Sequence, residues 1–330
     1  MADLADAVGA IVPATGRYAV QGAQVRAGLE LWAVHAGRRL VVEDDGSRPE
    51  EAARLYPNLA GRGCRFVLGP YGSDSTRAVA LARAGEIVWN HGGAADDVQR
   101  LPGVVSLPSP ASRYLVAVAR AIAELRPGAS VAVAAAAGQF ARLAREGLEQ
   151  AAPSLGLEMA GGSSLHEAPG TVAALRPDAV IACGPVEREV ALFRLLRQVV
   201  PRALLAGVSP GLAGFPDLLG GDPEGMLAPV QWHPELGRTP ELGPGSAEVV
   251  AEAHGAIDYV GAQAYAAALI AEHCLELEAA DPLAAARRLK TTTFFGRFEL
   301  DAETGLQVGH RLSVVRWRRG RQELLLVDAA

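Results

Sequence analysis

The stretch from Phe66 to Ala82 reads FVLGPYGSDSTRAVALA and contains the pattern that decides the fold. An apolar run enters a Gly-Pro-Tyr-Gly turn, and small and apolar residues then follow at helical spacing. This order predicts a buried strand, a turn and a helix that begins at Ser73. The first turn of a helix has unpaired N–H groups and the positive end of the helix dipole, so it attracts anions. Ser73, Ser75 and Thr76 add hydroxyls there, which favours a carboxylate or phosphate site, although an ordinary N-cap at Ser73 is the alternative.

Short apolar runs and helical patterns alternate on both sides of this stretch. In the first third of the chain, strands are expected at 8–13, 40–43, 64–69 and 87–90, and helices at 21–36, 49–61 and 73–85. The alternation restarts with helices at 111–125, 139–152 and 186–199 and strands at 130–135, 178–183, 203–208 and 225–231. Strands that alternate with helices form parallel sheets covered on both faces. The sequence therefore predicts an α/β fold of two doubly wound, Rossmann-like lobes.

Later segments indicate how the chain connects these lobes. Residues 246–279 are helical in pattern, and alternation on both sides of an Asp-Ala-Glu-Thr-Gly turn at 301–305 predicts an antiparallel hairpin. Linker-like composition near 107, 235 and 310 predicts three hinge crossings. The expected N-terminal lobe is 4–106 plus 236–309, and the expected C-terminal lobe is 107–235 plus 310–330.

Composition excludes several classes of protein. The chain of 330 residues is 50% hydrophobic and has a net charge of -6, which argues against nucleic acid as a partner, because the arginine-rich stretch 316–321 is short and strand-like. Three widely spaced cysteines without a CxxC motif indicate neither a zinc site nor a disulfide scaffold. The sequence has no apolar run of eighteen residues and no charged-then-apolar leader. Both a cytosolic protein and one whose signal has been removed fit this pattern.

Ligands of open α/β sheets bind outside the carboxyl ends of the strands, and small, hydroxylic and aromatic residues gather at those positions in this chain. The candidate ligand-binding residues are Tyr18, Tyr71, Gly72, Ser73, Asp74, Ser75, His91, Gly92, Gly93, Ala94, Phe140, Gly184, Pro185, Ser209 and Trp232. No set of histidines and carboxylates has metal-ligand spacing, and phosphate-loop and GxGxxG signals are missing. We therefore expect neither a metal nor a cofactor.

The order of these segments resembles that of the type I periplasmic solute-binding proteins of ABC transporters, in particular the leucine/isoleucine/valine-binding family. The resemblance covers nearly the whole chain and depends on VGAIVPATGRYAVQGAQVRAGLELW, FVLGPYGSDST, AAGQFARLAREGL, GMLAPV and FGRFELDAETG. It implies two lobes that close on a ligand in the cleft between them. It also implies a monomer that passes its ligand to a membrane permease, and a periplasmic or extracellular location, with a leader or lipid anchor outside this sequence.

The resemblance further implies roles for individual residues. In this family a serine and amides at the position of Ser73, and backbone at the turn of Gly92 and Gly93, hold the carboxylate of the ligand. Tyr18 and Phe140 match aromatic residues of the side-chain pocket, and Trp232 follows a strand that ends at the cleft.

Two features depart from the pattern of the family. The expected threonine hydroxyl is replaced by Ala94, and the acid that meets the ligand's ammonium falls near Ser209, which is not acidic. Either another acid takes this part, with Asp74, Asp96, Glu187 and Glu235 as candidates, or the ligand has no ammonium. An aromatic or branched aliphatic carboxylate is therefore expected to fit at least as well as a branched-chain amino acid.

Two other functions are alternatives to transport. The same fold serves as the ligand-sensing domain of receptors and of amide-type regulators, and no residue in the chain separates these roles. A serine hydrolase is the remote alternative, because residues 207–211 match G-x-S-x-G and His91-Gly-Gly resembles an oxyanion loop. The residue after Ser209 is Pro210, which has no N–H to donate to an oxyanion. We therefore expect no enzymatic activity.

Overall fold

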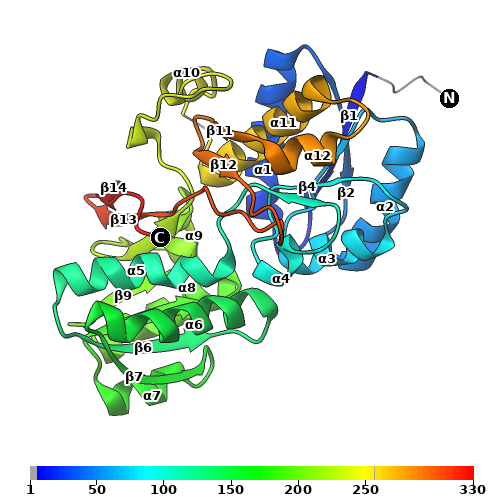
Figure 1. The fold of residues 1–330 in the computed structure, drawn as a ribbon. Helices are drawn as coiled ribbons and strands as arrows, with labels where there is room; N and C mark the ends of the chain where they lie inside the picture. The colour runs from blue at the N-terminus through cyan, green and yellow to red at the C-terminus, as the bar shows by residue number, and fades with distance from the viewer. Residues whose placement is uncertain (1–5, 256) are drawn as a thin grey trace. The chain divides into compact units, whose positions relative to one another are not determined.

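The computed structural model describes residues 6–255 and 257–330, which form two compact units. Unit 1 comprises the described residues up to Pro110 together with Pro234–His310, and unit 2 comprises Ala111–His233 and Arg311–Ala330. Each unit contains its own sheet with helices on both faces (Figure 1). The predicted fold class, α/β with two doubly wound lobes, is confirmed.

The sheet of unit 1 has five parallel strands in the order β2-β1-β3-β4-β5. Its strands are β1 (Ala7–Val12), β2 (Arg39–Asp44), β3 (Val67–Leu68), β4 (Val88–Asn90) and β5 (Val104–Ser106). A separate antiparallel pair consists of β11 (Lys290–Thr292) and β12 (Arg297–Glu299). Because β1, β3 and β4 are parallel neighbours, the loops that follow them lie at one edge of the sheet.

Helices cover both faces of this sheet (Figure 1). They are α1 (Ala19–Ala36), α2 (Pro49–Gly61), α3 (Ser73–Ala82), α4 (Asp96–Gln99), α10 (Ser246–Glu252), α11 (Tyr259–Leu277) and α12 (Pro282–Arg288). Under α2 and α3 lies a cluster of buried side chains that includes Ile11, Tyr56 and Val79. On the other face α1 and α11 lie side by side, so close that a Cβ at Gly28 would stand 2.0 Å from the carbonyl oxygen of Gly261.

The sheet of unit 2 has seven strands in the order β14-β13-β10-β9-β8-β6-β7. They are β6 (Ser130–Ala135), β7 (Glu158–Ser164), β8 (Ala179–Cys183), β9 (Leu204–Gly207), β10 (Leu227–Val230), β13 (Ser313–Arg318) and β14 (Arg321–Leu326). The first five are parallel, whereas β13 and β14 pair antiparallel with their neighbours. The arginine-rich stretch 316–321 is thus the turn between two strands and the strand ends beside it.

The helices of unit 2 are α5 (Ala111–Leu125), α6 (Gln139–Ala151), α7 (Ala168–Leu175), α8 (Val186–Val199) and α9 (Phe215–Leu219), with short 3-10 turns at Ala152–Leu155 and Ser209–Gly211. In Figure 1 α5 and α6 lie side by side on one face of the sheet. Strands β6, β8 and β9 are buried along most of their length, as expected for parallel strands covered on both faces.

The structure differs from the predicted elements in several places, among them residues 246–279, residues 301–305 and β7. The helical stretch 246–279 is two helices, α10 and α11, and one of its residues, 256, lies outside the described part of the chain, as do residues 4 and 5 of the expected first lobe. The hairpin around 301–305 is reduced to one bridge between Leu300 and Gln307, because β12 pairs with β11 and β13 pairs with β10 and β14. Strand β7 was missed because EMAGGSS lacks the β-branched and aromatic residues typical of strands.

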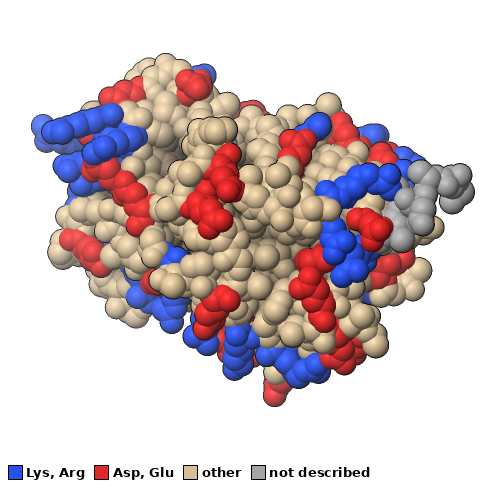
Figure 2. Space-filling model, turned by 90° about the horizontal axis from the view of Figure 1, so that it is seen from above, with Lys and Arg blue, Asp and Glu red and all other residues tan. Residues whose placement is uncertain are grey.

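Three further observations concern the surface charges, the helices and the cysteines. On the face drawn in Figure 2, acidic and basic side chains lie intermixed. Among residues 6–255 and 257–330, no helix combines the length and the apolarity needed to cross a bilayer. The three cysteines, all in the described part of the chain, are free thiols.

Candidate ligand-binding site

The predicted site residues fall into two sets, one at the carboxyl edge of each sheet. In unit 1 the edge comprises the turns after β1, β3 and β4 and the first turn of α3, which together contain Tyr18, residues 71–75 and residues 91–94. In unit 2 it comprises the turns after β6, β8, β9 and β10 and the first turn of α6, which together contain Phe140, Gly184, Pro185, Ser209 and Trp232.

Glycines allow the turns of unit 1 to pack backbone against backbone. Gly72 has a φ of 96°, and its N–H donates to the carbonyl of Gly92 at 3.2 Å. A Cβ at Gly92 would lie 2.7 Å from the Cα of Tyr71, which no larger residue could accommodate without moving the turn. The start of α3 and the turn after β4 are therefore held together as one surface.

Ser73 joins these two turns through its side chain. It is the first residue of α3, and its Oγ accepts the N–H of Ala95 at 3.0 Å. The N-cap position belongs to Gly72, so the alternative in which Ser73 merely caps its own helix is not what the structure shows. Because the oxygen accepts from Ala95, the hydroxyl hydrogen remains available as a donor.

Two buried side chains at this edge have polar atoms with no hydrogen-bond partner among the described residues. They are the Oγ of Ser75, in the first turn of α3, and both ring nitrogens of His91, which follows β4. Ser75 is 1% exposed and His91 is fully buried. Burial lowers the pKa of His91 to about 4, so its ring is neutral at pH 7. Each unpaired buried group costs about 1–3 kcal/mol, which a ligand that pairs with it would recover.

The N–H groups of Gly92 and Gly93 have an acceptor within the protein. Asn90, the last residue of β4, accepts both at its Oδ1, at 3.1 Å and 2.7 Å. Its Nδ2 donates to the carbonyl of Gly93 and to Ser106 Oγ, each at 2.8 Å. Sequence reasoning missed Asn90, although a polar residue that ends an apolar strand was a visible signal. The donors left at this edge include the N–H groups of the first turn of α3, the hydroxyls of Ser73 and Ser75 and the ring N–H of His91.

Aromatic and charged side chains border the same turns. The rings of Tyr18 and Tyr71 meet edge to face with centroids 5.4 Å apart, and the guanidinium of Arg17 lies 4.6 Å from the Tyr18 ring. Arg17 also pairs with the exposed carboxylate of Asp74 at 3.5 Å. Asp74 therefore faces a cation at the surface. Ala94 is buried, as is Asp96 at the start of the four-residue helix α4.

The aromatic residues of unit 2 are placed by partners within that unit. The ring of Phe140 meets Tyr114 edge to face at 5.0 Å, and the Tyr114 hydroxyl is paired with Gln231. Trp232 is 2% exposed. Glu187 and Glu235 are exposed to solvent.

Ser209 is hydrogen-bonded to a buried carboxylate, that of Glu189, which was not predicted from the sequence. Glu189 is fully buried and accepts the hydroxyl of Ser209 at 2.6 Å, its N–H at 2.9 Å and the N–H of Gly184 at 2.7 Å. The hydroxyl of Ser209 is therefore hydrogen-bonded to a carboxylate and not to a histidine, and Pro210 supplies no N–H. The geometry around residues 207–211 lacks the parts of a nucleophile elbow.

One comparison with known proteins shows a family, and another shows the fold. Residues 7–322 match the sequence profile described as periplasmic binding protein. No curated protein matches the sequence. A solute-binding protein from R. palustris, solved in complex with benzoate, is 19% identical at a TM-score of 0.81, with 99% of this chain and 96% of that chain covered.

Two relatives of the amino-acid-binding type are equally similar in structure. LivJ from Streptococcus pneumoniae, solved in complex with isoleucine, is 15% identical at a TM-score of 0.83, with 97% of this chain and 99% of that chain covered. The leucine-binding protein LivK from Thermotoga maritima is 16% identical at 0.81, with 96% and 97% covered. Identities this low show a shared fold.

Proposed function

The chain belongs to the periplasmic binding protein family, and from that membership we propose that it is the solute-binding protein of an ABC importer and acts outside the cytoplasm. Its ligand is a small aromatic or branched aliphatic carboxylate. The ligand is passed to a membrane permease, and hinge closure between the two units accompanies binding.

One observation carries the carboxylate assignment. The first turn of α3 offers backbone N–H groups, the Ser73 hydroxyl and a buried Ser75 Oγ that lacks a partner in the described chain, all at one edge of the sheet. These groups donate hydrogen bonds, and the helix dipole adds a positive potential. A carboxylate is the small organic group that takes up such donors at neutral pH.

The side chains around this turn support a ligand without an ammonium group. Of the four candidate acids, Asp74 is paired with Arg17, Glu187 and Glu235 are exposed, and Asp96 is buried at the start of α4, where it has interactions of its own. The buried carboxylate of Glu189 accepts three hydrogen bonds from Gly184 and Ser209. The neutral ring of His91 supplies a donor and an acceptor for an uncharged polar group of the ligand. The benzoate and isoleucine complexes of the relatives fit the size of ligand that we propose.

A thermal-shift screen tests the proposal. The panel pairs each of leucine, valine and isoleucine with its keto acid, and adds benzoate and 4-hydroxybenzoate. We expect benzoates or keto acids to raise the melting temperature, since a ligand that binds only the folded state stabilises it by mass action. Stabilisation by the amino acids but not by their keto acids would show that the ammonium site is present after all. No stabilisation by any member of the panel would contradict a carboxylate ligand.

A further inference from the structure

Glu189 is a carboxylate placed where no solvent reaches it. It lies in the first turn of α8 and is fully buried. Its Oε1 accepts the N–H of Gly184 at 2.7 Å, and its Oε2 accepts the N–H and the hydroxyl of Ser209 at 2.9 Å and 2.6 Å. One side chain thus binds two separate turns.

These two turns follow adjacent parallel strands. Gly184 comes directly after β8, and Ser209 comes two residues after the end of β9, with which β8 pairs. The carboxylate reaches both because residue 207 is glycine: a Cβ there would lie 2.9 Å from Oε2 of Glu189 and 2.7 Å from the Phe193 ring. The lack of a side chain at Gly207 therefore provides the space that the carboxylate of Glu189 occupies.

We propose that Glu189 is a positioning residue, which holds the turns at Gly184 and Ser209 in the shape that receives the ligand, and that protonation of its carboxylate weakens ligand binding. This inference rests on the proposed function, because Gly184, Pro185 and Ser209 are the ligand-binding candidates of unit 2.

The chemistry of the three hydrogen bonds gives the direction of the effect. An ionised carboxylate only accepts, so it satisfies all three donors. When it is protonated, its new hydrogen must compete with donors that already point at the two oxygens, and at least one hydrogen bond is weakened or lost. The turns at Gly184 and Ser209 are then less firmly fixed. A ligand that contacts them binds with lower affinity, because binding must also order the turns.

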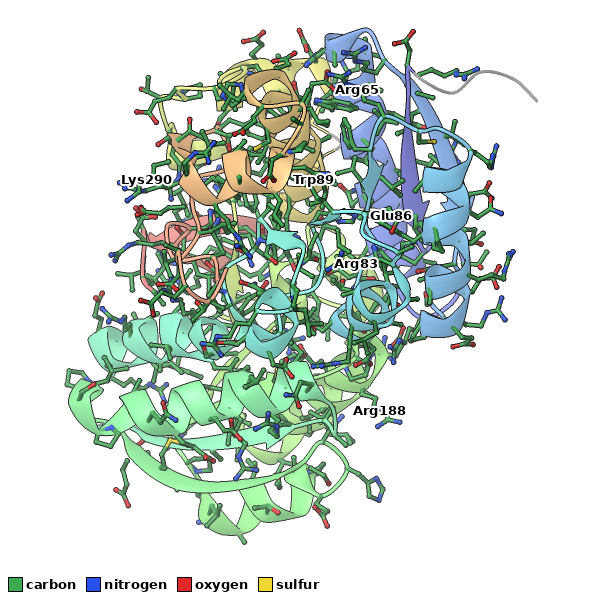
Figure 3. The ribbon with its side chains drawn as sticks, turned by 45° about the vertical axis from the view of Figure 1, so that its right-hand side comes forward. Arg65, Arg83, Glu86, Trp89, Arg188 and Lys290 are labelled. Carbon is green, nitrogen blue, oxygen red and sulfur yellow. The ribbon has the colours of Figure 1, made fainter. Side chains whose placement is uncertain are left out.

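Burial places this protonation near neutral pH, because it raises the pKa of Glu189 to about 7. Burial, and after it the nearby charge of Glu189, raises the pKa of the Cys183 thiol at the end of β8, so this thiol stays neutral. On α8, Arg194 donates to the carbonyls of Leu218 and Leu219, whereas Glu187 and Arg188 are exposed, and Figure 3 shows Arg188 pointing outward. On α9, Asp217 is exposed.

The test measures ligand affinity against pH. Benzoate and isoleucine are titrated calorimetrically into the wild-type protein, Glu189→Gln and the matched control Glu187→Gln between about pH 5.5 and 8.5, where the carboxyl groups of both probes stay ionised. For the probe that binds, we expect the wild-type affinity to fall about tenfold from the upper to the lower limit. Glu189→Gln should bind about tenfold more weakly at the upper limit, with a flat profile, because its amide N–H group replaces one acceptor. Glu187→Gln should follow the wild type.

A second variant keeps the test decisive if Glu189→Gln does not fold. Ser209→Ala removes one hydrogen bond to the ionised carboxylate, so it should move the midpoint of the pH profile to higher pH, which a loss of packing alone would not do. An unchanged midpoint in Ser209→Ala, or a wild-type pH profile in Glu189→Gln, overturns the inference. If the wild-type protein binds neither probe at any pH, it is the proposed ligand class that fails.

Discussion

At the scale of single residues, the hydrogen bonds at the carboxyl edge of unit 1 decide which groups can bind a ligand. Asn90 accepts hydrogen bonds from the N–H groups of Gly92 and Gly93, and Ser73 accepts one from the N–H of Ala95. The backbone N–H groups of these three residues are thereby hydrogen-bonded within the protein. Recognition of an anion is left to the start of α3.

Replacing Ser73 by alanine should weaken carboxylate binding about tenfold or more, because a charge-assisted hydrogen bond contributes roughly 1.5–3 kcal/mol. The same change leaves the Ala95 N–H without its acceptor, so the free energy of unfolding should also fall by about 1 kcal/mol. Calorimetric titration and urea unfolding of the variant measure the two effects.

Ser313→Ala is the matched control for this substitution. Ser313 is a buried serine whose Oγ also accepts a backbone N–H, that of Asp328 at 3.2 Å, but it lies in unit 2, on β13 opposite Val230, and not at the start of α3, where we propose that the carboxylate binds. It should lose stability to a similar extent and keep its affinity. If both variants lose only stability, Ser73 holds the turn and does not bind the ligand.

At the scale of helices and strands, the sequence was most informative where periodicity was strong. The bounds predicted for α2, α5, β6 and α8 agree with the structure residue for residue. Prediction failed where pairing or packing overrides local pattern: β7 is poor in strand-forming residues, and β12 pairs with β11 instead of forming the expected hairpin. The order of the strands was enough to predict which turns lie at the carboxyl edge. The buried site of Glu189 could not be predicted, because this residue lies in the first turn of a helix, where an acidic side chain is normally exposed to solvent.

Two glycine-to-alanine substitutions, one where α1 meets α11 and one in α7, should change stability in opposite directions. Gly28→Ala should lower the free energy of unfolding by about 1–3 kcal/mol, because its Cβ would collide with the Gly261 carbonyl and force the helices apart. Gly170→Ala, in α7, has open space around the new methyl and should raise stability by up to about 1 kcal/mol. Urea unfolding of both variants compares a packed with an unpacked helical glycine; equal effects would contradict the close helix contact.

Glu272, near the C-terminal end of α11, forms ion pairs with two arginines of unit 1. It is buried, and it accepts from Arg38 at 2.5 Å and from Arg65 at 3.1 Å; Arg65, labelled in Figure 3, precedes β3 at the amino edge of the sheet. Glu272→Gln should destabilise unit 1 by about 1–3 kcal/mol while ligand affinity stays unchanged. Thermal unfolding and titration of this variant check both statements, and a clear loss of affinity would show that the amino edge influences the site.

At the scale of the whole molecule, two buried groups give stability opposite dependences on pH. The pKa of Glu189 rises from 4.5 to about 7 on folding, so its contribution is present below pH 4.5 and is lost as pH rises to about 7. The pKa of His91 falls from 6.5 to about 4, so stability is lost as pH falls from 6.5 to about 4. Each effect is on the order of 3 kcal/mol, so they largely cancel in the wild-type protein.

Substitution of either residue should reveal how the other one makes stability depend on pH. Between about pH 4.5 and 6.5, Glu189→Gln should become more stable as pH rises, and His91→Asn should become less stable. Urea unfolding at several pH values, followed by tryptophan fluorescence, measures this. Profiles that run parallel in the two variants and the wild type would contradict the shifted pKa values that burial gives both groups.

Ligand binding should also change the dimensions of the molecule. Hinge closure predicts a smaller radius of gyration in small-angle scattering once a stabilising carboxylate is added at saturation. A radius that stays the same under those conditions would count against closure.

The three passages of the chain between units have a consequence for its synthesis. Unit 1 acquires α11, which packs against α1, only after the residues of unit 2 up to His233 have been made, and unit 2 acquires β13 and β14 only from the last residues of the chain. Neither unit can therefore finish folding while the ribosome is still elongating the chain, although domains usually fold in turn from the N-terminus. The last elements of both units are therefore added late in synthesis, so the two units are expected to complete their folding close together in time.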